Sequence, residues 1–206
     1  MCRFRRLGSI VPMVVVLLGA GRARAAVADG TQAGFLIHSE AVIHAAPDSV
    51  CRALAGRIGA WWDWEHAFSG GSRNLSLDAT SGGRFRESLP EGGGVRHLTV
   101  VFAFPGRMLR LIGGLGPLQG AGVAGSLTWG LSLALHGAKV VVDYSVGGCF
   151  PGGLPGVAPA VGTVLGKQFS RLKRFVETGR RIRSRPAGPR PSAAGGAFCV
   201  SRSLGR

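Results

Sequence analysis

One stretch near the end of the chain, residues 159–178, constrains the fold more than any other. At about 100° per residue, its apolar side chains and one amide share a single arc. The residues on this arc are Val161, Val164, Leu165, Gln168, Leu172, Phe175 and Val176. Charged and small polar side chains occupy the opposite side, so the pattern predicts an amphipathic helix with one face to bury. Pro159 suits the first helical turn and Gly179 suits a C-terminal stop.

The segments before this helix alternate apolar and polar residues with the period of two that is typical of half-buried strands. They are residues 35–44, 74–78, 84–87, 95–104, 108–112, 126–135 and 139–146. Short turns such as Pro105-Gly106 and His136-Gly137 join the later ones, which makes neighbouring strands antiparallel. After the first strand, Pro47 opens a short helix with Val50, Leu54 and Ile58 at helical spacing. We therefore expect an α+β domain with a sheet of about seven strands.

The net charge of +15 is unevenly distributed along the chain. Residues 1–25 contribute +5 and the tail from residue 180 contributes +7, both without any acidic residue. The middle of the chain is therefore nearly neutral, at +3. A nucleic-acid-binding domain carries its basic stripe on the fold itself, so we expect no nucleic-acid partner.

Residues 1–25 have the three parts of an export signal. A basic start, Cys2 to Arg6, precedes an apolar run from Leu7 to Gly21, and Ala23-Arg24-Ala25 is a small-x-small cleavage site. The apolar run is about 15 residues long, whereas a transmembrane helix needs about 20. We expect cleavage near Ala25, a periplasmic or secreted protein, and no stable membrane span in the mature chain. A retained N-terminal anchor is the alternative.

The domain boundaries follow from composition. Residues 26–33 are interpreted as a linker, residues 34–179 as the folded domain, and residues 180–206 as a basic, disordered tail without apolar periodicity. Signal removal leaves Cys51, Cys149 and Cys199. Their spacing leaves open either free thiols or a Cys51–Cys149 disulfide.

One glycine motif is misleading. The segment from Gly120 to Gly125 matches G-x-G-x-x-G, with Asp143 further on. The dinucleotide fingerprint must open a helix, but a period-two strand follows here. We interpret the glycine-rich stretch 114–125 as a lid or hairpin over a cavity. Zinc, calcium and serine-hydrolase motifs are also absent from the sequence, so no cofactor or metal site is expected.

The order of these elements resembles the helix-grip fold of the SRPBCC, or START-like, superfamily. The residues that carry the resemblance are Ala45 to Val50 with Leu54, Trp61-Trp62, Val100 to Pro105 with Leu109, and Leu165, Leu172 and Phe175. The sequence looks closest to the polyketide cyclase/dehydratase and heat-shock ATPase-activator-homologue branches. The resemblance implies a curved sheet around the last helix, with a short helical pair after the first strand and an apolar cavity between sheet and helix. Cys51, where the family often has an aromatic residue, and the long glycine-rich insertion depart from the pattern.

For the ligand-binding residues we select Gln168 and Leu172 from the helix, Trp129 and Tyr144 from the strands, and Trp62 at the mouth. A buried amide such as Gln168 needs a partner, because an unpaired one costs about 1–3 kcal/mol. That partner is another polar group, such as a strand side chain, or a water molecule or a ligand.

The acid–base candidates are Asp63, Glu65, His66, Glu87 and His97. Strand parity does not settle whether Glu87 and His97 face inward. No catalytic residue is assigned, because the family shares none.

The resemblance implies three functions. The first is an exported binding protein for a lipid or polyketide-like molecule. The second is a cyclase/dehydratase-type enzyme that uses general acid–base catalysis on such a molecule. The third is a chaperone-type interaction module. We expect the first.

Overall fold

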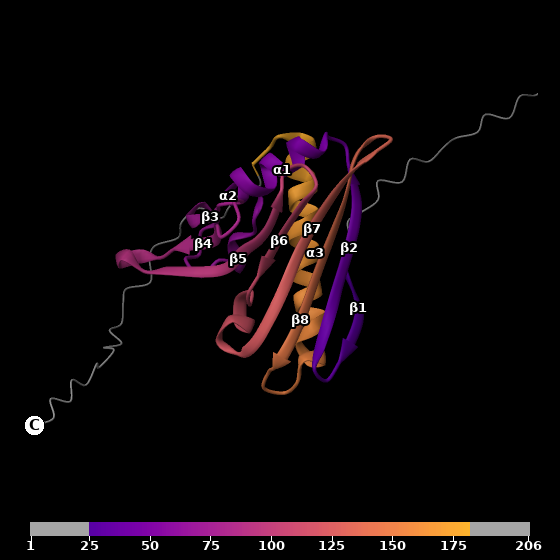
Figure 1. The fold of residues 1–206 in the computed structure, drawn as a ribbon. Coiled ribbons are helices and arrows are strands. Elements are labelled where there is room, and N and C mark those ends of the chain that lie inside the picture. Colours follow the sequence, from indigo (N-terminus) through magenta and orange to yellow (C-terminus); the bar gives the residue numbers. More distant parts are fainter. Residues whose placement is uncertain (1–24, 182–206) are drawn as a thin grey trace, which may run out of the picture.

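The protein forms one eight-stranded antiparallel sheet, seen in a computed structural model that describes residues 25–181. The strand order is β1-β2-β8-β7-β6-β5-β4-β3. The strands are β1 (Ala25–Thr31), β2 (Gly34–Ile43), β3 (Leu75–Leu77), β4 (Arg84–Ser88), β5 (Gly94–Phe104), β6 (Met108–Ile112), β7 (Gly122–Ala134) and β8 (Gly137–Cys149). Strands β3 to β5 run crosswise to β2, β7 and β8, so the sheet is strongly bent (Figure 1). This architecture confirms the α+β class and is consistent with a helix-grip fold.

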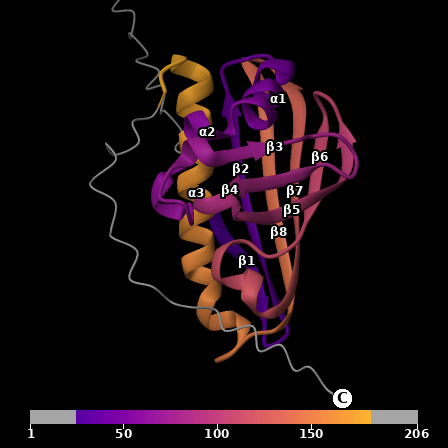
Figure 2. The ribbon, with the colours of Figure 1, turned by 90° about the vertical axis from the view of Figure 1, so that its left-hand side faces the viewer.

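The C-terminal helix α3 (Leu154–Thr178) lies along one face of the sheet, beside β1, β2 and β8 (Figure 2). It begins five residues earlier than the predicted start at Pro159, which is inside the helix. The reason is that Pro155 already fills the first helical turn, where the missing N–H of a proline costs nothing. The predicted stop is confirmed. Gly179 is left-handed, with φ of 65°, and its N–H bonds to the carbonyl of Phe175 at 2.9 Å.

Aromatic packing joins α3 to the sheet. Phe169, which the predicted arc omitted, is fully buried and packs edge-on against Trp129, with 6.0 Å between ring centroids. Trp129 also meets Trp61 at 6.4 Å. One turn further along the helix, Lys173 donates to the carbonyl of Val42 at 2.7 Å. These contacts fix the second half of the helix to the sheet.

Strand β1 corrects the prediction of about seven strands. Residues 26–33 were expected to be a linker, but Ala25–Thr31 pairs with β2 and forms one edge of the sheet. Its sequence, AAVADGT, does not alternate apolar and polar residues. Main-chain hydrogen bonds to β2 hold it in place, and these need no buried face. Residues 1–24 of the predicted export signal and residues 182–206 of the basic tail lie outside the described residues.

A helical pair follows β2, as expected: α1 (Pro47–Gly56) and α2 (Ile58–Trp61). Four short 3-10 turns complete the described part of the chain: η1 (Trp64–His66), η2 (Ser72–Asn74), η3 (Pro90–Gly92) and η4 (Gly116–Gly120). Cys51, on α1, and Cys149, at the end of β8, are free thiols.

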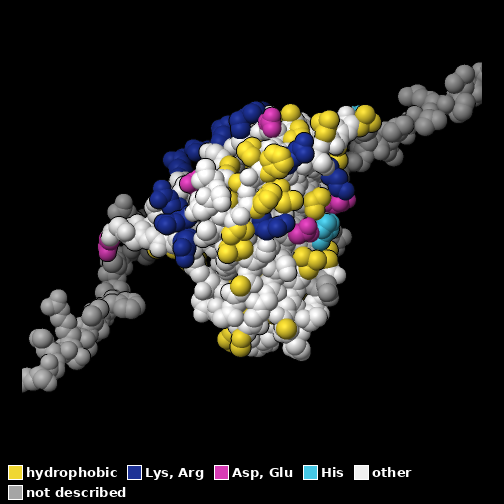
Figure 3. All heavy atoms as spheres, in the orientation of Figure 1, with side chains coloured by type: hydrophobic (Ala, Val, Ile, Leu, Met, Phe, Trp, Pro, Cys, Tyr) yellow, Lys and Arg dark blue, Asp and Glu magenta, His cyan; other side chains and the backbone are white. Residues whose placement is uncertain are grey.

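The outer face of the sheet carries apolar side chains with Lys and Arg around them (Figure 3). They include Val101, Phe102 and Phe104 of β5 and Ile112 of β6, each 43–51% exposed. Among residues 25–181, no helix is long and apolar enough to cross a bilayer.

Candidate ligand cavity

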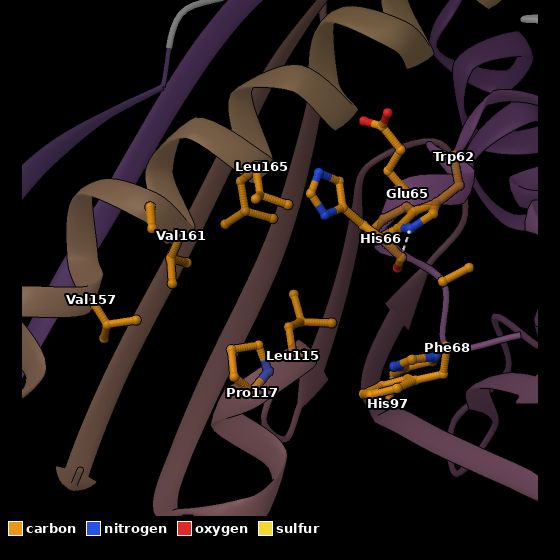
Figure 4. Close-up of a pocket in the computed structure, with 14 residues that line it drawn as sticks. Trp62, Glu65, His66, Phe68, His97, Leu115, Pro117, Val157, Val161 and Leu165 are labelled. Atoms are coloured by element: carbon orange, nitrogen blue, oxygen red, sulfur yellow. Dashed lines mark hydrogen bonds between the residues drawn. The ribbon is translucent and has the colours of Figure 1, made fainter. Parts of the chain in front are cut away.

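A cavity of about 410 Å³ opens between α3 and the chain segments at the bent end of the sheet. Figure 4 is a close-up of the residues that line it. Its lining is largely aliphatic and aromatic: Trp62, Glu65, His66, Ala67, Phe68, His97, Leu115, Gly116, Pro117, Val157, Ala160, Val161, Val164 and Leu165. Pockets for small molecules typically have about 300–1,000 Å³ and mostly apolar walls, so this one has the size and character of a ligand site.

The helix wall of the cavity comes from the first half of α3. Val157, Val161 and Leu165 lie four residues apart, so they stack on one side of the helix. In Figure 4 all three point toward Leu115 and Pro117 on the opposite wall. Val161 and Leu165 belong to the predicted apolar arc, but here part of that arc faces a void rather than the sheet.

Tyr144 holds the opposite wall in place. Its hydroxyl accepts a hydrogen bond from the N–H of Leu115 and donates one to the carbonyl of Gly113, each at 3.2 Å. The ring lies against Gly125, where an added Cβ would be 2.5 Å from a ring carbon. Burial raises the pKa of Tyr144 to about 12, so the hydroxyl stays protonated at neutral pH. Tyr144 therefore positions the glycine-rich loop of the cavity from behind.

The segment after α2 forms the rim. Trp62 is 7% exposed and packs against Phe85 with 5.2 Å between ring centroids. Its indole N–H donates to the carbonyl of His66 at 3.2 Å. The neighbouring Asp63 is buried and pairs with Nζ of Lys167 at 2.6 Å. Lys167 also pairs with Glu65, at 2.9 Å. This cluster fixes the rim to α3.

The polar end of the cavity is a buried pair of Glu87 and His97. Nε2 of His97 lies 3.1 Å from Oε2 of Glu87, and the side chains are 4% and 0% exposed. The carboxylate of Glu87 also accepts the backbone N–H groups of Phe68 and Ser69, at 3.1 and 2.5 Å. Phe68 stacks on the imidazole with 5.8 Å between ring centres (Figure 4). His97 lines the cavity, whereas Glu87 lies behind it.

A β-bulge explains why His97 faces inward. In the pairing of β4 with β5, Phe85 is opposite Leu98 and Arg86 is opposite Arg96, so His97 is the extra residue. A bulge breaks the alternation of faces and re-aims one side chain. His97 and Leu98 are consequently both buried, at 5% and 1% exposure. The alternation of residues in the sequence does not reveal the bulge, so it could not predict that His97 faces inward.

The protonation states of the pair follow from its surroundings. Burial acts to raise the pKa of Glu87, but hydrogen bonds from Ser69, Phe68 and His97 outweigh it and hold the pKa below its ordinary value. Burial lowers the pKa of His97, and Glu87 offsets this only in part. At neutral pH the pair is thus a carboxylate and a neutral imidazole. The imidazole proton is on Nε2, which donates to Glu87, and Nδ1 carries the lone pair.

Only one of the five predicted ligand-binding residues lines the cavity. Trp62 lines the cavity, whereas Trp129, Tyr144, Gln168 and Leu172 are buried in the core beside it. The side-chain oxygen of Gln168 accepts the backbone N–H of Asp63, so its partner is neither a strand side chain nor the cavity. Its Nε2 is fully buried and has no partner in the described part of the chain.

Of the acid–base candidates, Glu65, His66 and His97 line the cavity. Asp63 is in the ion pair with Lys167, and Glu87 reaches the cavity only through His97. Phe68 and Val157 are among the lining residues that the sequence did not indicate. The interpretation of stretch 114–125 located the right loop, since Leu115 to Pro117 form one wall, and Gly122 to Gly125 belong to strand β7.

Comparisons with known proteins show likeness in fold alone. No family profile matches the sequence, and no curated protein sequence matches it. A conserved protein of unknown function from Enterococcus faecalis, EF2215, has a similar structure, with a TM-score of 0.53, 17% identity, and coverage of 79% of this chain and 82% of that one. CalU16 from Micromonospora echinospora has a TM-score of 0.51 and 16% sequence identity, with coverage of 76% of this chain and 84% of that one. DynU16, a protein from the dynemicin biosynthetic locus, has a TM-score of 0.50 and 20% sequence identity. The match covers 71% of this chain and 48% of the DynU16 chain.

Proposed function

We propose that this protein binds a hydrophobic small molecule, such as a lipid or a polyketide-like compound, in the cavity between α3 and the bent sheet. The observation that carries the proposal is the cavity itself. Its walls are formed by Val157, Val161 and Leu165 on one side and Leu115 and Pro117 on the other. A liquid water molecule occupies about 30 Å³, so a 410 Å³ apolar space suits one organic molecule far better than ordered water.

Two further points support the proposal. The cavity walls are pre-formed, because Tyr144 holds Leu115 and the Asp63–Lys167 pair holds the rim. Pre-formed walls favour binding because fewer protein groups have to become ordered when the ligand binds.

The similar fold of DynU16, from the dynemicin biosynthetic locus, is compatible with a small-molecule ligand. The basic, apolar start of the sequence supports export, so the site of action we propose is outside the cytoplasm.

Binding is tested with 2-methoxynaphthalene, an apolar fluorescent probe, in fluorescence titrations of the purified protein. We expect saturable one-to-one binding. The variant Val161→Phe fills the cavity from α3 and should weaken binding at least tenfold. Val42→Phe is the matched control, because Val42 is 40% exposed on the outer face. Absence of saturable binding, or equal affinity of Val161→Phe and wild type, would contradict the proposal.

An acid–base enzyme is the second candidate, favoured by the presence of His97, His66 and Glu65 in the cavity wall. A neutral imidazole can take a proton from carbon next to a carbonyl group. The test is deuterium exchange at the acidic C–H groups of 2-tetralone, followed by NMR. Exchange faster than in buffer, lost in His97→Phe, would favour the enzyme. A rate equal to buffer would exclude this reaction.

A further inference from the structure

We propose that the ligand is an apolar molecule with a phenolic or enolic hydroxyl group, and that this hydroxyl donates its proton to Nδ1 of His97 in a hydrogen bond. This inference rests on the proposed function, because it concerns the same cavity. It assigns His97 as the residue that determines specificity and Glu87 as the residue that positions it.

The first step is the orientation of the imidazole. Glu87 accepts three hydrogen bonds, from the N–H groups of Phe68 and Ser69 and from Nε2 of His97. An ionised carboxylate only accepts, so Nε2 of His97 has to carry the ring proton. The imidazole also packs against two aromatic rings, with 5.8 Å between ring centroids for Phe68 and 4.8 Å for Phe85. Both the tautomer and the plane of the ring are thus fixed before a ligand arrives.

The second step concerns the other ring nitrogen. Within residues 25–181, Nδ1 of His97 has no hydrogen-bond partner from the protein. It is also not an enclosed polar atom, because Gln168 Nε2 is the only fully buried side-chain N or O atom without a partner in that range. His97 is part of the cavity wall, so its free acceptor is available to a molecule in the cavity.

The third step is the chemistry of the partner. A neutral imidazole nitrogen with a lone pair accepts a hydrogen bond and cannot donate one. The surrounding wall is mostly apolar, with Phe68, Leu115 and Pro117 labelled near His97 in Figure 4. A ligand that leaves Nδ1 unpaired after displacing solvent binds at least about fivefold more weakly than one that pairs with it. A ligand with a well-placed hydroxyl group avoids this penalty, and a more acidic hydroxyl forms the stronger bond.

The test compares 2-naphthol with 2-methoxynaphthalene, which differ only in that a methyl group replaces the hydroxyl proton. We expect the wild-type protein to bind 2-naphthol at least about fivefold more tightly, which is the lower end of the penalty for an unpaired buried acceptor. In His97→Phe, which keeps the aromatic contacts, the two affinities should become equal. Equal affinities in the wild type would overturn the inference and leave the proposed function intact. Failure of both probes to bind would contradict both the inference and the proposed function.

A second readout reports on the acceptor directly. Excited 2-naphthol is a strong acid, so its O–H bond breaks when a base is in contact, and the proton forms an N–H bond with Nδ1. The products are naphtholate and imidazolium, and the proton returns after emission. Excitation beyond the tryptophan absorption should give naphtholate emission from the wild-type complex and neutral naphthol emission from His97→Phe. Neutral emission from the wild-type complex would overturn the inference.

Glu87→Gln tests the positioning role. A glutamine at this site cannot accept from all three N–H groups, so the imidazole loses its fixed tautomer. The expected result is a preference for 2-naphthol that falls toward equality while binding of 2-methoxynaphthalene persists. Glu40→Gln is the matched control, because Glu40 pairs with Lys139 and does not line the cavity, and it should keep the preference. If Glu87→Gln also keeps it, the positioning role of Glu87 is wrong.

Discussion

The side-chain oxygen of Gln168 accepts a hydrogen bond from the backbone N–H of Asp63 at 2.9 Å, across 105 residues of sequence. This bond joins the middle of α3 to the corner that follows α2. The same corner provides Trp62, Glu65 and His66 to the rim of the cavity. The helix and the rim are therefore one structural unit, and the cavity lies beside their junction.

Loss of the Lys167–Asp63 ion pair should weaken this junction. Asp63 is buried and Lys167 is 45% exposed, so solvent screens part of the interaction. We predict that Lys167→Met lowers the free energy of unfolding by about 1–2 kcal/mol in urea denaturation, because a buried carboxylate loses its partner. Lys139→Met is the matched control. Its ion pair with Glu40 is about half exposed on both sides, so solvent screens it more strongly and we expect a smaller loss. Equal losses in the two variants would contradict the structural role of Lys167.

The same pair makes stability depend on pH. Burial acts to raise the pKa of Asp63, but hydrogen bonds from Lys167 and Glu65 and the charge of Arg171 outweigh it, so the pKa lies below its ordinary value. A carboxyl with a lowered pKa stabilises the folded state above its unfolded pKa of about 3.9, and this contribution is lost as the pH falls through the lowered value. Urea denaturation of Asp63→Asn and wild type should therefore differ most at neutral pH and converge in acid. A difference that does not depend on pH would contradict this.

Gly125 provides space for the ring of Tyr144. An added Cβ at Gly125 would lie 2.5–2.7 Å from three atoms of Tyr144, whereas one at Gly120 would have nothing within 4 Å. We predict that Gly125→Ala lowers the free energy of unfolding by about 1–3 kcal/mol through overpacking, and that Gly120→Ala has almost no effect. Both glycines belong to the G-x-G-x-x-G match. Equal effects of the two substitutions would contradict the packing role of Gly125.

Tyr144 is the only tyrosine in the chain, so tyrosinate absorbance reports on this residue alone. Its pKa is about 12 in the folded protein, against about 10 in an unfolded chain. We predict little tyrosinate at pH 10.5 in the native protein and substantial ionisation in urea. Because the folded pKa is raised, this group contributes stability below about pH 10 that is lost as the pH rises toward 12. A native titration midpoint near 10 would show that the hydroxyl is solvated.

Removal of the hydroxyl should affect the loop that it holds. Tyr144→Phe leaves the N–H of Leu115 and the carbonyl of Gly113 without their partner. We predict a loss of about 1–3 kcal/mol in the free energy of unfolding. Affinity for 2-methoxynaphthalene should also fall, because Leu115 forms a wall of the cavity. Unchanged stability would show that these two hydrogen bonds are not formed in solution.

The periodic parts of the sequence predicted the fold well. The arc of Leu165, Leu172 and Phe175 located the buried face of α3, and alternation located seven of the eight strands. Strand β1 was missed because main-chain pairing at an edge needs no alternating side chains. Phe169 was missed because the buried side of α3 is wider than the chosen arc.

The site was less predictable, for physical reasons. Periodicity shows that a side chain points inward, but not whether it meets another side chain or a void. Trp129 and Leu172 point inward and meet other core residues, whereas Val161 meets the cavity. The bulge at His97 and the path of the loop at Leu115 depend on tertiary structure. The signal that was present was the glycine-rich loop itself, which the sequence analysis did associate with a cavity.

The most direct measurement is a crystal structure of the protein with 6-bromo-2-naphthol, in which anomalous scattering locates the bromine atom. We predict a single strong bromine position between Val161 and Leu115, with the hydroxyl group toward Nδ1 of His97. Bromine bound only on the outer face of the sheet, or a cavity without bromine at saturating concentration, would contradict the claim that this protein holds a hydrophobic molecule between its last helix and its sheet.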